Sequence, residues 1–256
     1  MIQISAVIIT FNEEKNIGRC IDSLLQVADE ILVIDSFSID RTEVICLEKG
    51  VRFLQHPFEG HIEQKNYAIS QAKFPYVLSL DADEALSPQL IQSVLQIKNS
   101  TPLDGYYLNR LTNYCGHWVR YCGWYPDKKL RLFDSRKGRW AGTNPHDIYL
   151  LDGTSKTGKL QGDILHYSYY TFEDHIKQIN FFSNIAAREA FMKGKKYSFF
   201  EKIILSPFVK FLQSYFLQLG FLDGYYGFVI SIASSFATFS KYVKLRQLWK
   251  DEQAKS

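Results

Sequence analysis

The first hundred residues alternate between apolar runs of β type and segments with helical periodicity, and this alternation constrains the fold more than any other feature. Residues 4–9 form a continuous apolar run rich in β-branched residues, as expected for a strand buried on both faces. The other predicted elements are strands at 30–34, 51–54 and 75–80 and helices at 13–25, 41–49, 61–72 and from 87 onward. Repeated βα units predict an α/β fold with a mostly parallel central sheet and helices on both faces.

The later sequence differs in character from this first region. Residues 104–167 contain short alternating runs with Gly, Trp and Tyr, which predict antiparallel strands and long loops. From residue 171 the pattern is helical again. We therefore expect one α/β domain at 1–170, followed by a helical region at 171–256.

The helical region is basic and aromatic. The whole chain has a net charge of +3, whereas residues 188–256 contain eleven Lys or Arg and five Asp or Glu. Residues 224–240 carry no charge, and Lys241 and Lys244 follow them. This stretch is at the lower limit for a membrane span, so an amphipathic helix lying in the membrane surface is favoured. A spanning helix and a buried core or dimer helix pair remain alternatives.

Other classes of partner and site are disfavoured. The aromatic residues of the basic region lie among aliphatic residues and not among Arg and Lys, so a membrane surface is expected and nucleic acid is not. The cysteines have no paired metal spacing, and a zinc site around Cys115, His117 and Cys122 would lack a fourth ligand. The N-terminal residues do not resemble a secretory signal, which favours a cytoplasmic location.

Two carboxylates follow the strand predicted at 75–80. Asp81 and Asp83 are two residues apart, so both side chains point to one side if the extended backbone continues. Two neighbouring carboxylates repel each other unless a cation lies beside them. Mg²⁺ and Mn²⁺ suit oxygen ligands and complete their coordination with phosphate oxygens and water. The alternative is that this pair merely forms a turn or a helix cap.

Polar residues also follow the first two predicted strands. Thr10, Asn12 and Glu13 come after the first strand, and Asp35 and Asp40 come after the second. These groups could accept hydrogen bonds from a nucleoside, although Asp40 could equally cap a helix and Asp35 close a turn. Neither a Gly-x-Gly-x-x-Gly fingerprint nor a P-loop is present, which argues against a dinucleotide cofactor.

Taken together, the motifs resemble the family 2 glycosyltransferases, and in particular the bacterial lipopolysaccharide core β-1,4-glucosyltransferases. The likeness extends from residue 4 to about residue 248. The motifs that carry it are Thr10-Phe11-Asn12-Glu13-Glu14, Asp35 with Asp40-Arg41-Thr42, Gln64-Lys65-Asn66, Leu80-Asp81-Ala82-Asp83-Glu84, Gly123-Trp124-Tyr125-Pro126-Asp127, Arg131-Leu132-Phe133 and Gly220-Phe221-Leu222-Asp223-Gly224. The resemblance implies a GT-A fold, a UDP-sugar donor, Mg²⁺ or Mn²⁺, and inversion at the anomeric carbon.

The resemblance also implies roles for individual residues. It places Lys65 near the diphosphate, Asp81 with the donor and the metal, and Asp83 with the metal. Apart from the resemblance, we expect His166 as a further contact to the metal or to phosphate. The residues that the resemblance places around the nucleoside are Thr10, Asn12, Glu13 and Asp35. Asp147 is the expected catalytic base, which takes a proton from the acceptor hydroxyl.

Two positions depart from the family pattern. Phe37 stands where a small residue such as Gly is usual, and Asp147 stands where Glu is usual in similar proteins. The path of the loop at Phe37 and the identity of the base therefore depend on the structure.

The resemblance divides the α/β domain into a nucleotide-binding half at 1–100 and an acceptor half at 101–170. It implies transfer of a sugar, with glucose expected, to a lipopolysaccharide or lipooligosaccharide core or another lipid-linked glycan. We expect peripheral attachment to the inner face of the cytoplasmic membrane through the C-terminal helices, and a homo-oligomer is possible. The alternatives are a sugar nucleotidyltransferase and a non-catalytic nucleotide-binding assembly protein.

Overall fold

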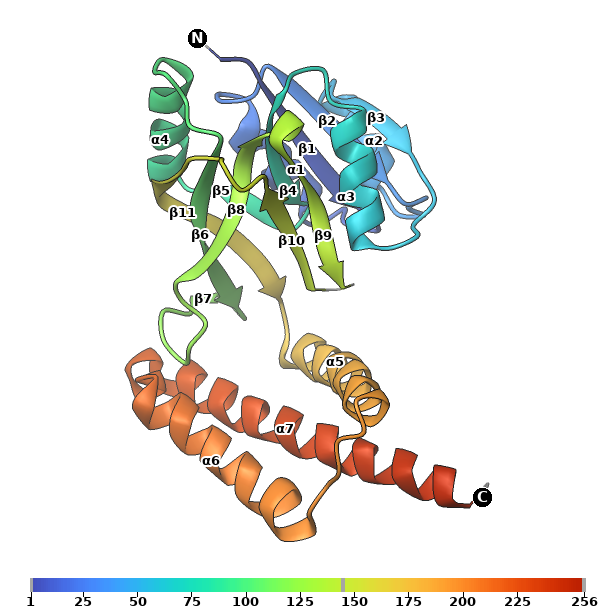
Figure 1. The fold of residues 1–256 in the computed structure, drawn as a ribbon. Helices are drawn as coiled ribbons and strands as arrows, with labels where there is room; N and C mark the ends of the chain where they lie inside the picture. The colour runs from blue at the N-terminus through green and yellow to red at the C-terminus, as the bar shows by residue number, and fades with distance from the viewer. Residues whose placement is uncertain (1, 144–145, 255–256) are drawn as a thin grey trace. The chain divides into compact units, whose positions relative to one another are not determined.

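The computed structural model describes residues 2–143 and 146–254, which form two compact units (Figure 1). The first unit contains the residues up to 111 together with 127–167, and the second contains 112–126 and the residues from 168 onward. Residues 112–126, which lie within the range 1–170, therefore group with the helical second unit.

The first hundred residues form the predicted βα units. Their elements are β1 (Ile4–Thr10), α1 (Ile17–Leu24), β2 (Glu30–Asp35), α2 (Thr42–Glu48), β3 (Arg52–Gln55), α3 (His61–Ser70), β4 (Tyr76–Asp81) and α4 (Pro88–Lys98). Strands β3, β2, β1 and β4 are adjacent in this order and pair in parallel. Ser87 caps α4, since its side chain accepts a hydrogen bond from the backbone of Leu90.

The sheet continues with antiparallel strands. The remaining strands are β5 (Glu84–Leu86), β6 (Gly105–Tyr114), β7 (His117–Trp118), β8 (Asp127–Asp134), β9 (Gly138–Thr143), β10 (His146–Leu151) and β11 (Thr157–Tyr169). The strand order is β3-β2-β1-β4-β8-β6-β11-β5, with β7 paired to β6, while β9 and β10 form a separate hairpin. Sequence analysis did not resolve this hairpin or the short strands β5 and β7.

The strands alternate their side chains between two apolar cores. Ala6 and Ile8 of β1 face one core, where buried residues of α1, α2 and α4 also pack. Val7 faces the other core, with α3 and the β9–β10 hairpin. Because successive strand residues point to opposite faces, each apolar strand contributes to both cores. This arrangement confirms the predicted α/β fold with helices on both faces of the sheet.

The second unit consists mainly of helices, drawn in orange and red in Figure 1. They are α5 (Phe172–Met192), a π-helical turn at Phe199–Leu205, α6 (Ser206–Leu212), a second π-helical turn at Gln213–Leu217, a 3-10 turn at Gly220–Asp223 and α7 (Gly224–Gln253). Thr171 and Asp174 form a capping box at the start of α5. Helix α7 packs against both α5 and α6.

Asp223 anchors the segment 112–126 within the second unit, and a close backbone contact fixes the start of α7. The buried carboxylate of Asp223 accepts hydrogen bonds from the backbone of Arg120 and Tyr121, the latter at 2.8 Å. Gly227 lies so close to Gly220 that a Cβ at Gly227 would be 1.7 Å from the Gly220 carbonyl oxygen. The glycine is therefore required where α7 passes the preceding turn.

Many large apolar side chains of the second unit are exposed, among them Phe208, Phe216, Leu217, Phe228, Ile232, Phe236 and Phe239. In the described part of the chain, no helix alone has both the length and the apolar character to cross a membrane. The segments Phe199–Leu217 and Gly220–Gln253 satisfy that criterion only as a pair, with a bend of 70° between them.

Candidate active site

The strand register brings the ends of three strands to one edge of the sheet. Thr10 of β1 pairs with Asp35 of β2, and Ile9 of β1 pairs with Asp81 of β4. Ligands of open α/β sheets bind at the carboxyl ends of parallel strands. The structure thus brings together Thr10, Asp35 and Asp81, which were selected from separate segments of the sequence.

Asp81 lies between two buried cations. Its Oδ1 atom is 3.0 Å from Lys65 Nζ, and its Oδ2 atom accepts a 2.8 Å hydrogen bond from Arg131 Nη2. Burial by itself would raise the pKa of Asp81, but the charges of Arg131 and Lys65 outweigh burial and hold this pKa well below its usual range. Asp81 is therefore a permanent carboxylate at the end of β4.

Lys65 connects Asp81 to the expected base. Its Nζ atom donates a 2.8 Å hydrogen bond to Asp147 Oδ2, so one ammonium group contacts carboxylates from β4 and β10. The Lys65 side chain is only 3% exposed and lies 4.6 Å from the centre of the Trp140 ring. Helix α3 thereby positions Lys65 where both of its partners are largely shielded from water.

Sequence reasoning did not assign Arg131 and Glu84 to the site. Arg131 Nη2 binds Glu84 Oε1 at 3.1 Å as well as Asp81, and Glu84 Oε2 accepts a hydrogen bond from the Asp81 backbone. Both side chains are almost fully buried. One feature of the sequence could have indicated this pair: Arg131 is the only charged residue in the otherwise apolar run 130–133. A charge that is buried with such a strand requires a partner of opposite charge.

Asp83 and His166 form a second pair at the same edge. Strand β11 pairs with β5 so that His166 is opposite Glu84, and His166 Nε2 lies 3.1 Å from Asp83 Oδ2. Burial lowers the pKa of His166, but the charge of Asp83 and their hydrogen bond outweigh burial and raise it. The protonated imidazole is thus favoured beside the Asp83 carboxylate.

Glu13 lies within the electrostatic influence of this pair. Burial raises its pKa to about 6; a hydrogen bond from Asn16 opposes that shift, and the charge of Asp83 adds to it. A carboxyl group with such a pKa takes up a proton near pH 6, at a higher pH than an ordinary glutamate, and a cation bound nearby would lower this pKa.

The loops after β1 and β2 are tied to each other by hydrogen bonds. Asn12 Oδ1 accepts from the backbone of Ile39, and the Asn12 backbone donates to Ser38 Oγ. The buried Asp35 carboxylate accepts from both the backbone and the hydroxyl of Ser38. Asp35 therefore shapes the loop after β2, and buried Thr10 Oγ1 is left without a hydrogen-bond partner among the described residues.

Phe37 explains why a small residue is usual in this loop. Its φ angle is 62°, in the left-handed region that favours glycine, and its side chain is about half exposed. The loop keeps this backbone path with an aromatic side chain directed away from the core.

The site residues fit a divalent cation that a substrate would help to hold. Among the described residues, no three His, Cys, Asp or Glu side chains are grouped as a complete metal site. Mg²⁺ usually takes one or two protein carboxylates and completes its coordination with phosphate oxygens and water. Asp83 and His166 provide an oxygen and a nitrogen 3.1 Å apart, whereas both Asp81 oxygens already contact cations.

Comparison with known proteins identifies the family. The profile described as Glycosyl transferase family 2 matches residues 5–177. The chain belongs to this family. Family membership makes sugar transfer its class of activity, and the sheet and its covering helices are those of the GT-A fold.

Relatives of this glycosyltransferase match over nearly its whole length. An uncharacterized glycosyltransferase of Rickettsia typhi is 33% identical, with 97% of this chain and 88% of the relative covered. The lipopolysaccharide core biosynthesis glycosyltransferase LpsC of Rhizobium meliloti is 28% identical, with 95% and 92% covered. Glucosyl-3-phosphoglycerate synthase of Mycobacterium tuberculosis has a TM-score of 0.37 and 23% identity, with 44% of each chain covered.

Proposed function

We propose that this glycosyltransferase moves a sugar, with glucose as the first candidate, from a UDP-sugar to a lipopolysaccharide core or another lipid-linked glycan, with inversion. The observation that carries the proposal is the position of Asp81 and Asp83 at the end of β4, beside Thr10 and Asp35. The likeness to LpsC over most of both chains supports a lipid-linked acceptor.

The donor would bind along this edge of the sheet. Thr10, Asn12, Glu13 and Asp35 would surround the nucleoside. The Thr10 hydroxyl, which has no hydrogen-bond partner in the described part of the chain, is available for a hydrogen bond to it. Lys65 lies between the strand ends and could pair with phosphate oxygens. Arg131 keeps Asp81 ionised and fixed in orientation through their hydrogen bond.

Asp83 and His166 would hold Mg²⁺ or Mn²⁺, and His166 would release its proton as the metal binds. A bound dication neutralises the donor diphosphate and stabilises the charge that grows on the leaving group. The pairing of β5 with β11 sets the distance between Asp83 and His166, and it thereby orients both side chains for a metal ion.

Asp147 is the base in this proposal. Its carboxylate is largely buried and hydrogen-bonded to Lys65, which keeps it oriented. It would take the proton of the acceptor hydroxyl as that oxygen attacks the anomeric carbon. Direct displacement by one hydroxyl requires one base and no covalent intermediate, in contrast to the two carboxylates of retaining hydrolases.

The second unit would attach the enzyme to the cytoplasmic membrane from the inner side. Its exposed apolar side chains and the basic residues after residue 240 match the composition of helices that lie in a membrane surface. Such attachment would place the transferase where a lipid-linked acceptor is found.

Release of UDP from UDP-glucose, with Mn²⁺ and purified lipopolysaccharide core as acceptor, tests the proposal. Asp83→Ala should reduce turnover by at least about a hundredfold, the usual loss when one electrostatic group of a site is removed. Asp152→Ala is the matched control: this exposed carboxylate follows Leu151, at the other end of β10 from Asp147. Full turnover by Asp83→Ala with an unchanged thermal unfolding temperature would contradict the assignment of Asp83.

Two further measurements separate the alternatives. Pyrophosphate release from UTP and glucose 1-phosphate would indicate a nucleotidyltransferase. Absence of UDP release with every acceptor and nucleotide sugar, despite nucleotide binding by calorimetry, would favour a non-catalytic protein.

A further inference from the structure

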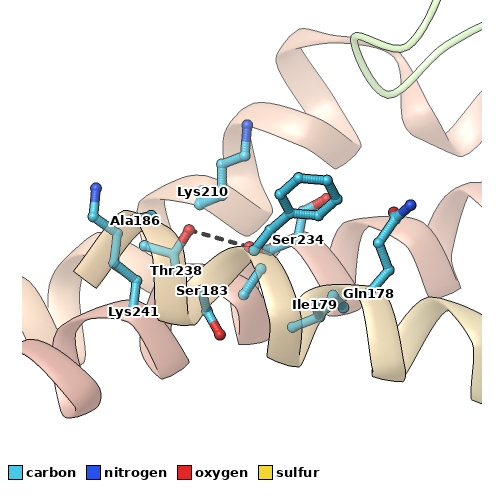
Figure 2. Close-up of a pocket in the computed structure, with 10 residues that line it drawn as sticks. Gln178, Ile179, Ser183, Ala186, Lys210, Ser234, Thr238 and Lys241 are labelled. Atoms are coloured by element: carbon cyan, nitrogen blue, oxygen red, sulfur yellow. Dashed lines mark hydrogen bonds between the residues drawn. The ribbon is translucent and has the colours of Figure 1, made fainter. Parts of the chain in front are cut away.

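Three helices of the second unit enclose a groove with a volume of about 340 Å³ (Figure 2). Its walls come from α5, α6 and α7, so the groove lies entirely within one unit. The lining residues are Gln178, Ile179, Phe182, Ser183, Ala186, Lys210, Ser234, Ala237, Thr238 and Lys241. Its volume is at the small end of the range for ligand sites in proteins.

The groove is more apolar than its sequence suggests, because several of its polar groups already have partners in the same unit. Thr238 Oγ1 donates to the carbonyl oxygen of Ser234, as the dashed line in Figure 2 shows. Ser183 Oγ donates to the Asn180 carbonyl and accepts from Lys244 Nζ. With these groups satisfied, the walls suit a hydrocarbon chain, whereas a peptide would bring backbone amides that need partners.

Two lysines provide positive charge at the groove. Lys210 of α6 and Lys241 of α7 extend toward the same side of the helices in Figure 2. No ion pair is found for either lysine within the described residues. Asp223 is the only acidic residue between 206 and 250, and its carboxylate is occupied by the 112–126 segment. This side of the groove therefore attracts an anion.

We propose that the groove binds one acyl chain of an anionic membrane lipid, with the lipid phosphate held between Lys210 and Lys241. The inference rests on the proposed membrane attachment and deepens it by naming the lipid class and the site. Stable membrane binding generally needs an apolar and an electrostatic contribution together. The groove, whose lining includes the partly exposed ring of Phe182, supplies the apolar contribution, and the two lysines supply the electrostatic one.

The charge contribution is tested with the full chain and vesicles of phosphatidylcholine with or without phosphatidylglycerol. Lys210→Gln with Lys241→Gln should weaken binding to the anionic vesicles about thirtyfold, from the usual contribution of two lysines at a membrane surface. Lys195→Gln with Lys196→Gln is the matched control, since both lysines are exposed and the charge change is the same. Equal losses in the two double variants would overturn the proposal, because they would indicate a general charge effect.

The groove itself is tested with dodecyl phosphate, titrated by calorimetry below its micelle concentration. We expect the wild type to bind the probe saturably, Ala237→Trp to lose this binding and Ile232→Trp to keep it. Ile232→Trp is the control because Ile232 is exposed on the same helix but does not line the groove. Undiminished binding to Ala237→Trp would overturn it, and so would equal affinity for inorganic phosphate. If Ala237→Trp does not fold by circular dichroism, the smaller Ala237→Leu takes its place.

UDP release is measured on every groove variant. Unchanged UDP release shows that the variants leave the first unit intact. If the wild type releases UDP but does not bind the lipid probes, only the lipid proposal fails. If the wild type binds the lipid probes but releases no UDP, only the proposed transfer reaction fails.

Discussion

The two units distribute polarity in opposite ways. The first unit buries charges at its strand ends, where Lys65 pairs with Asp81 and Arg131 pairs with both Asp81 and Glu84. The second unit exposes aromatic and aliphatic side chains along α6 and α7, as Phe208 and Phe236 illustrate. Buried charge must be paired to be tolerated, and exposed apolar surface of this extent usually marks an interaction site. The first unit is thus organised for a charged substrate and the second for an apolar neighbour.

The strongest test of this contrast removes one buried charge. Arg131→Met should lower the free energy of unfolding by about 3–5 kcal/mol, because Asp81 and Glu84 would lose a buried partner. Urea unfolding followed by fluorescence measures the change. Lys177→Met is the control: this lysine and its partner Glu173 are both exposed, and such surface pairs contribute at most about 1 kcal/mol. Similar losses in both variants would contradict the contrast between buried and exposed pairs.

The second unit should respond to acid through one buried histidine. Burial lowers the pKa of His175 to about 4, and its Nδ1 atom lies 3.0 Å from the Tyr114 hydroxyl. The unfolded chain binds the proton near pH 6.5 and the folded chain only near pH 4, so stability falls as the pH decreases between these values. The free energy of unfolding should be lower by about 3 kcal/mol at pH 4 than at pH 7 because of this one histidine. Urea unfolding at pH 7 and pH 4.5 measures this loss: the free energy of unfolding should decrease more in the wild type than in His175→Gln. Equal decreases in the two proteins would refute the role of His175.

Close backbone packing gives a smaller expected effect. Gly227→Ala should destabilise the second unit by about 1–3 kcal/mol, because the new Cβ would overlap the Gly220 carbonyl oxygen. Helix propensity alone predicts the opposite sign, a gain of about 1 kcal/mol. Gly153→Ala, with no atom within 4 Å of the added Cβ, should change the thermal unfolding temperature little. A stabilised Gly227→Ala variant would show that α7 can shift away from the turn.

The smallest expected effect concerns the exposed apolar surface. Phe236→Ser should lower the free energy of unfolding by only about 1 kcal/mol, since nearly half of this side chain is exposed. The same substitution should measurably weaken binding to phosphatidylglycerol vesicles. A large loss of stability together with unchanged vesicle binding would assign Phe236 to the core and reverse the interpretation of this surface.

Much of the parallel half of the sheet could be predicted from the sequence because its signals are local. The apolar runs at 4–9 and 30–34 differ by one residue from β1 and β2, and parallel pairing then brings Thr10 and Asp35 together. The acidic pair after β4 could be predicted for the same reason.

The contacts of Arg131 and Lys65 could not be predicted in this way. Lys65 and Asp147 are 82 positions apart, and no local periodicity indicates which buried lysine and carboxylate meet. The hairpin of β9 and β10, which supplies Asp147, has short alternating strands that lack a strong apolar signal. The grouping of 112–126 with the helices likewise depends on the distant Asp223.

The double contact of Lys65 has a kinetic consequence. Because the same ammonium group holds Asp81 and Asp147, a diphosphate that attracts Lys65 would weaken its hold on Asp147 and make this carboxylate a better proton acceptor. Asp147 would then accept the proton of the acceptor hydroxyl efficiently only while the donor is bound, so that activation of the acceptor is coupled to the presence of the nucleotide sugar.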